Sequence, residues 1–415
     1  MIITNNILWL TIVSFVTVPI RASETNQKPL VPPNPSKMEG YDPDTTPSSS
    51  GGSRWTPVLD PTNNNTIIGH HYSGLNYNVD DPCALQTLEI WHPATPASIA
   101  HGKPSLNETY GAGREAPWLV YIHGGAWRDP AIDSSSFTPS ATKILSSLFQ
   151  RSSSPIKKLA GIASINYRLS PYPNHPTSPS DPTDDSRTAQ HPDHIADVLT
   201  AIAHLEKYYG MKSYVLAGHS CGATLALQAC MDPARWEKDD DNKQGWGPKM
   251  FVKGGLGDGY GGVQEVAKPR TVVGFNGLYD LAGFIESPPQ GYERWREAYR
   301  EFVTSAFGSD EKVWRTACPA SAGPSWVKEW KLTQRGEEGK KRKAVLVQSL
   351  EDSLVPVEQT EGMARYLEKE NEQVNGDNKV EVAVLREEKG GDHDEVWQRG
   401  DRLGEILVSV LEGDI

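Results

Sequence analysis

Gly218-His219-Ser220-Cys221-Gly222 is the stretch from which the fold can be predicted. Residues 213–217 before it are apolar and β-prone, and residues 223–230 after it are helix-prone. A G-x-S-x-G pattern between a strand and a helix is typical of a nucleophile elbow, a tight turn that exposes the serine hydroxyl. Such a turn brings backbone close to backbone, so glycine is required on both sides of the serine. The Cys221 amide lies at the N-terminus of the predicted helix, where free N–H groups favour an anion.

A serine nucleophile requires a histidine base, which in turn requires an orienting acid. Behind an elbow of this kind the chain order is serine, acid, histidine. Of the 11 histidines, only His393 lies after Ser220. It falls in a polar loop between a predicted strand at 380–386 and a predicted helix at 395–411. His393 is therefore the predicted base, and a plain surface-loop histidine is the alternative.

The acid is expected after another strand. Residues 343–349 predict a buried strand, and Asp352 follows it, three residues before Val355-Pro356. Glu351 is one alternative. Asp280, after a predicted strand at 271–276, is another, although a turn or a helix N-cap would also explain it. We prefer Asp352.

The segment His123-Gly124-Gly125-Ala126-Trp127 follows a predicted strand at 118–122. Paired glycines let backbone amides point into a site without obstruction, as in the loop that donates N–H groups opposite the nucleophile in lipases and esterases. His123 precedes Ser220, the wrong order for a base, so we expect it to be structural. Trp127 either lines an aromatic substrate pocket or packs in the core.

Composition excludes several classes of partner. The 415-residue chain has a net charge of -12 and no basic stripe, which argues against nucleic acid and anionic membranes. The cysteines show neither metal-ligand spacing nor a dense disulfide framework; they are Cys83, Cys221, Cys230 and Cys318. The predicted chemistry needs no metal and no organic cofactor.

Predicted strands alternate with predicted helices, which indicates an α/β fold with a mostly parallel sheet covered on both faces. One domain is expected over residues 56–415, with insertions near 171–190, 232–268 and 331–343. The second insertion and residues 281–314 lie where a cap would be. A helix is predicted at 191–209, with His194 and His204 on its solvated face.

The N-terminal part is expected to lie outside this domain. Residues 1–24 include an apolar stretch of signal-peptide length, but no Lys or Arg precedes it. Residues 25–55 are rich in Pro, Ser and Gly, and we expect disorder there. Secretion, a later start at Met38, and glycosylation at Asn64 or Asn107 all stay open.

Several motifs together resemble one known family. Residues 123–127, extended by Arg128-Asp129-Pro130, match the H-G-G-x-W pattern of kynurenine formamidase (arylformamidase) in its fungal form, within the α/β-hydrolase superfamily. Asn166-Tyr167-Arg168 and residues 218–224 support this resemblance, which covers roughly residues 118–411.

The resemblance implies an α/β-hydrolase fold and hydrolysis of N-formyl-L-kynurenine to L-kynurenine and formate, a step of tryptophan degradation towards NAD. It implies an oxyanion hole formed by the amides of Gly125 and Ala126, beside that of Cys221. The expected partner is a small aromatic amino-acid substrate, and the expected location is the cytoplasm. A homodimer stays open.

Two other functions were weighed against the formamidase. A carboxylesterase or lipase-like hydrolase of the same fold would share the H-G-G loop, and Trp127 is what favours the formamidase. A non-enzymatic interaction protein would have lost the triad, whereas Ser220, Asp352 and His393 are all present.

Overall fold

The computed structural model describes residues 54–79, 81–104, 116–151, 157–236, 266–321, 323, 325–332, 341–376 and 379–415. These residues belong to one compact unit, Pro47–Ile415. The predicted N-terminal segments at 1–24 and 25–55 lie almost wholly outside the described residues. So do most of the predicted insertions at 232–268 and 331–343, and Asn107.

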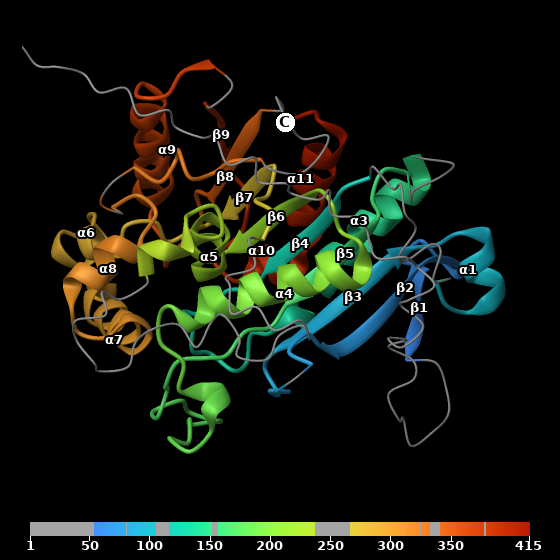
Figure 1. Cartoon of the computed structure of the whole chain (residues 1–415), viewed down its shortest axis with the longest axis horizontal. Coiled ribbons are helices and arrows are strands. Elements are labelled where there is room, and N and C mark those ends of the chain that lie inside the picture. Colours follow the sequence, from blue (N-terminus) through green and yellow to red (C-terminus); the bar gives the residue numbers. More distant parts are fainter. Residues whose placement is uncertain are drawn as a thin grey trace, which may run out of the picture. The chain divides into compact units, whose positions relative to one another are not determined.

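One nine-stranded sheet forms the centre of the fold (Figure 1). The strands are β1 (Trp55–Asp60), β2 (Asn63–Asn76), β3 (Thr87–Pro93), β4 (Trp118–Ile122), β5 (Gly161–Ile165), β6 (Tyr214–His219), β7 (Thr271–Phe275), β8 (Arg342–Ser349) and β9 (Val380–Glu387). Their spatial order is β1-β2-β3-β5-β4-β6-β7-β8-β9. All pairings from β5 to β9 are parallel, whereas β1, β2 and β3 pair antiparallel and β3 joins β5 antiparallel. The predicted α/β-hydrolase fold is confirmed.

Helices follow β3 and each of the parallel strands β4 to β9. They are α1 (Pro96–His101), α3 (Thr138–Arg151), α4 (Asp193–Tyr209), α5 (Cys221–Gln228), α6 (Leu281–Glu286), α7 (Arg296–Phe307), α8 (Glu311–Ala317), α9 (Val357–Asn371), α10 (Glu395–Arg399) and α11 (Asp401–Glu412). Short 3-10 turns are η3 (Ser134–Phe137), η5 (Asp185–Arg187), η6 (Pro233–Trp236) and η7 (Glu293–Trp295). No described helix combines the length and the apolar character needed to cross a bilayer.

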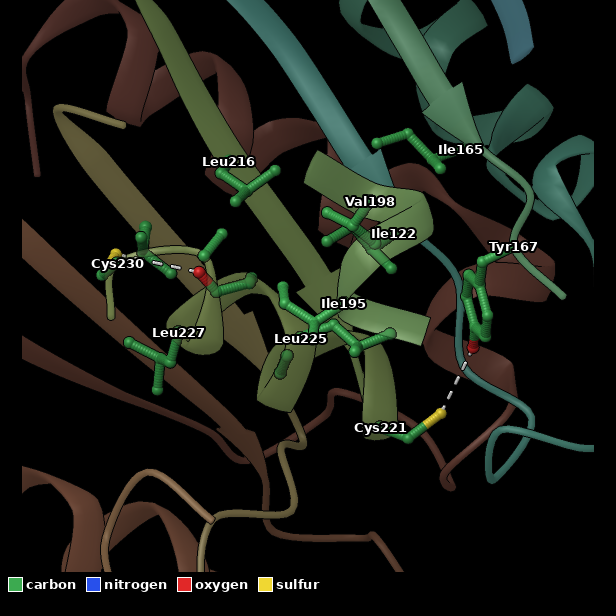
Figure 2. Packing of buried hydrophobic residues seen from close by; sticks show 14 of the residues in the cluster. Ile122, Ile165, Tyr167, Ile195, Val198, Leu216, Cys221, Leu225, Leu227 and Cys230 are labelled. Carbon is green, nitrogen blue, oxygen red and sulfur yellow. Dashed lines mark hydrogen bonds between the residues drawn. The ribbon is translucent and has the colours of Figure 1, made fainter. Parts of the chain in front are cut away.

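The inner parallel strands β4 to β7 are mainly apolar because both faces of the sheet are buried there. In β4, Leu119 and Tyr121 pack into one cluster with α3 and α11. Their neighbours Val120 and Ile122 pack into a second cluster with α4, α5 and α9. Figure 2 shows part of this second cluster, in which Ile122 lies near side chains of α4 and α5.

The structure corrects one prediction about α4. His194 and His204 are buried, with 1% and 4% of their surface exposed, rather than facing solvent. Loops cover the outer side of the helix. His194 Nε2 contacts Ser170 Oγ at 2.9 Å, and His204 Nδ1 contacts the carbonyl oxygen of Tyr77 at 3.2 Å.

The predicted helix at 395–411 is divided into α10 and α11. Gly400 separates them in a left-handed conformation with φ 69°. A Cβ atom at this position would approach Pro139 Cβ at 2.6 Å, so the close packing against α3 also favours glycine.

The elbow glycines give a test of the fold. A Cβ on Gly222 would collide with the carbonyl oxygen of Ile122. Gly222→Ala should therefore lower the free energy of unfolding by about 3 kcal/mol, the upper end of overpacking costs. Gly362→Ala, inside α9 with open space around it, should raise it by up to about 1 kcal/mol. Urea denaturation measures both, and equal effects would contradict the steric argument.

Candidate active site

The elbow forms where β6 meets α5. Ser220 lies between the two elements with φ 55° and ψ −123°, a conformation that costs about 1–3 kcal/mol and persists only when neighbours enforce it. A Cβ on Gly218 would collide with the carbonyl of Gly222. The Ser220 amide donates to the carbonyl of Phe275 at 2.9 Å. The serine is thus fixed at the carboxyl ends of the parallel strands, with 5% of its surface exposed.

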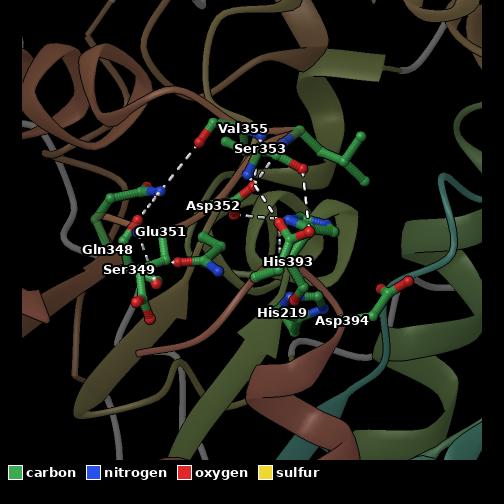
Figure 3. Close-up of polar contacts among 12 residues, drawn as sticks. His219, Gln348, Ser349, Glu351, Asp352, Ser353, Val355, His393 and Asp394 are labelled. Atoms are coloured by element: carbon green, nitrogen blue, oxygen red, sulfur yellow. Dashed lines mark hydrogen bonds and ion pairs between the residues drawn. The ribbon is translucent and has the colours of Figure 1, made fainter. Parts of the chain in front are cut away.

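His393 and Asp352 form a buried pair (Figure 3). His393 Nδ1 lies 2.7 Å from Asp352 Oδ2. The other carboxylate oxygen, Oδ1, accepts the amides of Leu354 and Val355, both at 2.8 Å. Because a carboxylate only accepts, this contact places the imidazole proton on Nδ1 and leaves Nε2 as a proton acceptor.

The two alternative acids are engaged elsewhere. Glu351 Oε2 accepts the amide of Gly391 at 2.8 Å. Asp280 is the N-cap of α6, where its Oδ1 accepts the amide of Gly283 at 3.0 Å. The geometry therefore favours Asp352 as the partner of the histidine.

His219 connects the elbow with His393. Its Nε2 lies 3.0 Å from the backbone carbonyl oxygen of His393, and the two rings are 4.6 Å apart. Burial lowers the pKa of His219 well below its usual value, so the ring is neutral and donates from Nε2. A Cβ on Gly124 would approach His219 Nδ1 at 2.9 Å and Ser220 Cβ at 3.2 Å. Three parts of the site therefore meet at His219, namely the elbow, the glycine-rich loop and the loop that carries His393.

The glycine-rich loop has an unusual backbone. Gly125, Ala126 and Trp127 all have positive φ, at 95°, 49° and 60°. The Trp127 amide donates to Cys221 Sγ at 3.3 Å. This contact holds the loop, with its predicted oxyanion donors Gly125 and Ala126, against the start of α5.

Tyr167, which lies just after β5, supports the same loop. Its hydroxyl contacts the carbonyl oxygens of His123 and Gly124 at 3.2 and 3.1 Å, and its ring stacks on His123. It also lies 3.6 Å from Cys221 Sγ (Figure 2). Burial lowers the pKa of His123 to about 4, which fits a neutral structural residue. Sequence reasoning identified the Asn-Tyr-Arg motif but assigned Tyr167 no contact.

The thiol of Cys221 is expected to be protonated and unreactive at neutral pH. Burial raises its pKa to about 11, against the weaker opposite effects of the Tyr167 hydroxyl and the Trp127 and Ala126 amides. A protonated thiol is a poor nucleophile, which favours Ser220 over Cys221 as the nucleophile predicted for the elbow. All the cysteines are free. The described residues hold no cluster of His, Cys, Asp or Glu side chains that could bind a metal ion.

The structure distinguishes between the two interpretations of Trp127. Its side chain is completely buried and packs against Phe302 and Phe307 of α7. Because the indole lies between the glycine-rich loop and α7, the packing interpretation applies. Trp127 therefore has a structural role in the motif, because its side chain joins the glycine-rich loop to α7.

A buried histidine beside this packing gives a pH prediction. His191 contacts Phe307, and burial lowers its pKa to about 3. Below pH 6.5 the unfolded chain binds a proton here and the folded chain does not, so this group favours unfolding as the pH falls. Relative to His191→Phe, the wild type should lose about 1.4 kcal/mol of unfolding free energy between pH 7.5 and 5.5. Urea denaturation at both pH values measures this difference, and a constant difference would contradict it.

Three fungal proteins resemble the chain in sequence. A kynurenine formamidase-like hydrolase of Fusarium equiseti is 33% identical over 332 residues, 80% of this chain and 89% of that protein. Kynurenine formamidases of Aspergillus versicolor and Meyerozyma guilliermondii are each 30% identical, over 68% and 60% of this chain and 84% and 71% of their own length. No family model matches the chain. Among solved structures, an arylesterase aligns with a TM-score of 0.45 and 15% identity over 79% of each chain.

Proposed function

The chain belongs to the kynurenine formamidase family of α/β-hydrolases, and on that premise we propose that it hydrolyses N-formyl-L-kynurenine to L-kynurenine and formate in tryptophan degradation. Membership of this family makes the chain a hydrolase of amide or ester bonds. Fungal relatives named kynurenine formamidase support the formamide substrate. The catalytic residues of the proposal are Ser220, Asp352 and His393.

The contact between His393 and Asp352 is the observation that carries the mechanism. It lies beside the elbow, because His219, the neighbour of Ser220, contacts the His393 backbone. An imidazole with its Nδ1 proton held by a carboxylate is prepared to accept a proton at Nε2. This arrangement supports general-base activation of the Ser220 hydroxyl.

The reaction then proceeds in two steps. Ser220 Oγ attacks the formyl carbon as His393 takes its proton, and Asp352 stabilises the imidazolium. His393 next protonates the departing aryl amine, leaving a formyl ester on Ser220. Water, deprotonated by His393, attacks this ester and releases formate. The amides of Gly125, Ala126 and Cys221 stabilise the oxyanion in both steps.

One of the three proposed oxyanion donors, the Ala126 amide, has a weak partner in this structure. The Trp127 and Ala126 amides interact with the Cys221 thiol, and sulfur is a weak acceptor. A developing oxyanion in low-dielectric surroundings is a far better acceptor. We infer that the Ala126 amide can exchange the sulfur for the oxyanion at little cost.

Substitution of the triad tests this mechanism. Ser220→Ala should abolish turnover with the fold intact, and Asp352→Asn should lower kcat about 10⁴-fold through the wrong imidazole tautomer. Asp280→Asn and Glu351→Gln are matched controls that keep an acceptor oxygen at each position and should retain most of the wild-type kcat. Steady-state kinetics on N-formylkynurenine measures all four. If Asp280→Asn were the inactive variant, the acid would be misassigned.

Acyl-chain length tests the substrate. Ser220 and His393 have only 5% and 7% of their surface exposed, which favours the smallest acyl group. Each surplus methylene costs about 1–3 kcal/mol in a hydrophobic pocket, and a closed wall rejects it more strongly. We expect kcat/KM to fall at least about tenfold from N-formyl- to N-acetylkynurenine, and further for longer chains. A preference for butyryl or longer p-nitrophenyl esters would instead support a carboxylesterase.

A further inference from the structure

The loop that carries Asp352 is held by three aromatic side chains from a distant segment. The hydroxyl of Tyr292 donates to the carbonyl of Asp352 at 2.6 Å. The indole of Trp295 donates to the carbonyl of Ser353 at 2.8 Å, and the hydroxyl of Tyr299 donates to the carbonyl of Leu354 at 3.0 Å. Three successive carbonyls therefore each have a neutral donor from residues 292–299.

The amides of the same three peptide groups all bind carboxylates. The Ser353 amide donates to Asp392 Oδ1 at 2.9 Å. The amides of Leu354 and Val355 donate to Asp352 Oδ1 (Figure 3). In a planar trans peptide the C=O and N–H groups point in opposite directions. A donor that fixes the carbonyl therefore also fixes the direction of the amide on the other side.

This arrangement reaches the reacting groups in two ways. Two of the fixed amides occupy Asp352 Oδ1, which leaves Oδ2 directed at His393 Nδ1. The third binds Asp392, whose Oδ1 also accepts the backbone amide of His393 at 2.7 Å. Rotation of any one of the three peptide planes would break a bond to the carboxylate pair that positions His393.

The aromatic segment also contacts the glycine-rich loop. Phe302 and Phe307 of α7 pack on Trp127, and Glu301 pairs with Arg128 at 3.0 Å. One stretch, residues 292–307, thus contacts both the loop that carries Asp352, here called the acid loop, and the glycine-rich loop. This stretch lies within residues 281–314, which the sequence predicted to be part of a cap. It therefore links two loops of the site, the acid loop and the glycine-rich loop, that are far apart in sequence.

We propose that Tyr292, Trp295 and Tyr299 are positioning residues that align the catalytic carboxylate of Asp352 through the backbone of its loop. This inference rests on the triad proposed above. In this proposal the three side chains act by holding peptide planes and not by contacting the substrate. Their loss should lower kcat and leave KM nearly unchanged, because the alignment matters most when the imidazolium forms.

Tyrosine-to-phenylalanine substitutions test the proposal with little change in packing. Tyr299 is buried and stacks on Phe284 at 4.0 Å, a contact that phenylalanine keeps. Tyr292 is partly exposed, so water can replace part of its hydrogen bond. We expect kcat to fall about fivefold in Tyr292→Phe, about tenfold in Tyr299→Phe, and further in the double variant.

Tyr214→Phe is the matched control. The Tyr214 hydroxyl also donates to a backbone carbonyl, that of Ala267 at 2.6 Å, but it lies at the first residue of β6, the opposite end from Ser220. This variant should lose comparable stability and keep kcat within about twofold, because the same kind of hydrogen bond is removed away from the site.

The measurements are kcat and KM on N-formylkynurenine, the unfolding midpoint, and the proton NMR resonance of the His393 Nδ1 proton. In Tyr292→Phe and Tyr299→Phe this downfield resonance should shift or broaden, and in Tyr214→Phe it should match the wild type. An unchanged kcat and resonance in the double variant would overturn the proposal, as would an equal loss of kcat in the control.

Failure of this inference can be distinguished from failure of the triad. If Ser220→Ala is inactive while Tyr292→Phe and Tyr299→Phe match the wild type, only the positioning role is wrong. If Ser220→Ala keeps its activity, the proposed mechanism itself is wrong. Should Tyr299→Phe fold poorly, the partly exposed Tyr292→Phe tests the first of the three peptide planes alone.

Discussion

The positive φ of Ser220 is the constraint on which the rest of the site depends. This conformation is held because β6 and α5 leave the chain no other path between Gly218 and Gly222. The Gly222 backbone touches β4, and the Ser220 amide binds the end of β7. The central strands of the sheet therefore cooperate to position one side chain. Their full burial on both faces supplies the rigidity that this strain requires.

The remaining site groups come from loops, and backbone hydrogen bonds hold these loops. Tyr167 binds the carbonyls of the glycine-rich loop, His219 binds the carbonyl of His393, and Tyr299 binds a carbonyl of the acid loop. Each donor is neutral and buried. A buried carbonyl that lost such a partner would carry a desolvation cost of about 1–3 kcal/mol. These contacts therefore fix loop geometry without placing further charge near the reacting groups.

The sequence alone was sufficient to predict the features that depend on short-range patterns, namely the strands and the candidate triad residues. Apolar runs predicted β4 with the bounds that the structure has, and β6 to β8 within one or two residues, because strands buried on both faces have a distinctive composition. The edge strand β9 was predicted within one residue. His393 could be proposed from chain order, and Asp352 from chain order together with the predicted strand before it and Val355-Pro356 after it. The contacts of Tyr292, Trp295 and Tyr299 could not, because no local pattern links them to a loop more than fifty residues away. The role of Trp127 was ambiguous for a related reason, because the sequence of the motif is the same whether this side chain faces the substrate or the core.

The outer strands of the sheet have a consequence for aggregation. Among the described residues β1 and β9 are the edges, and an unprotected edge is a template for strand addition by another copy. β1 contains Pro57, which has no N–H to offer, and its pairing with β2 shifts register after Val58. β9 carries Glu381, whose carboxylate pairs with Lys343. Both edges therefore carry features that resist the growth of a continuous intermolecular sheet.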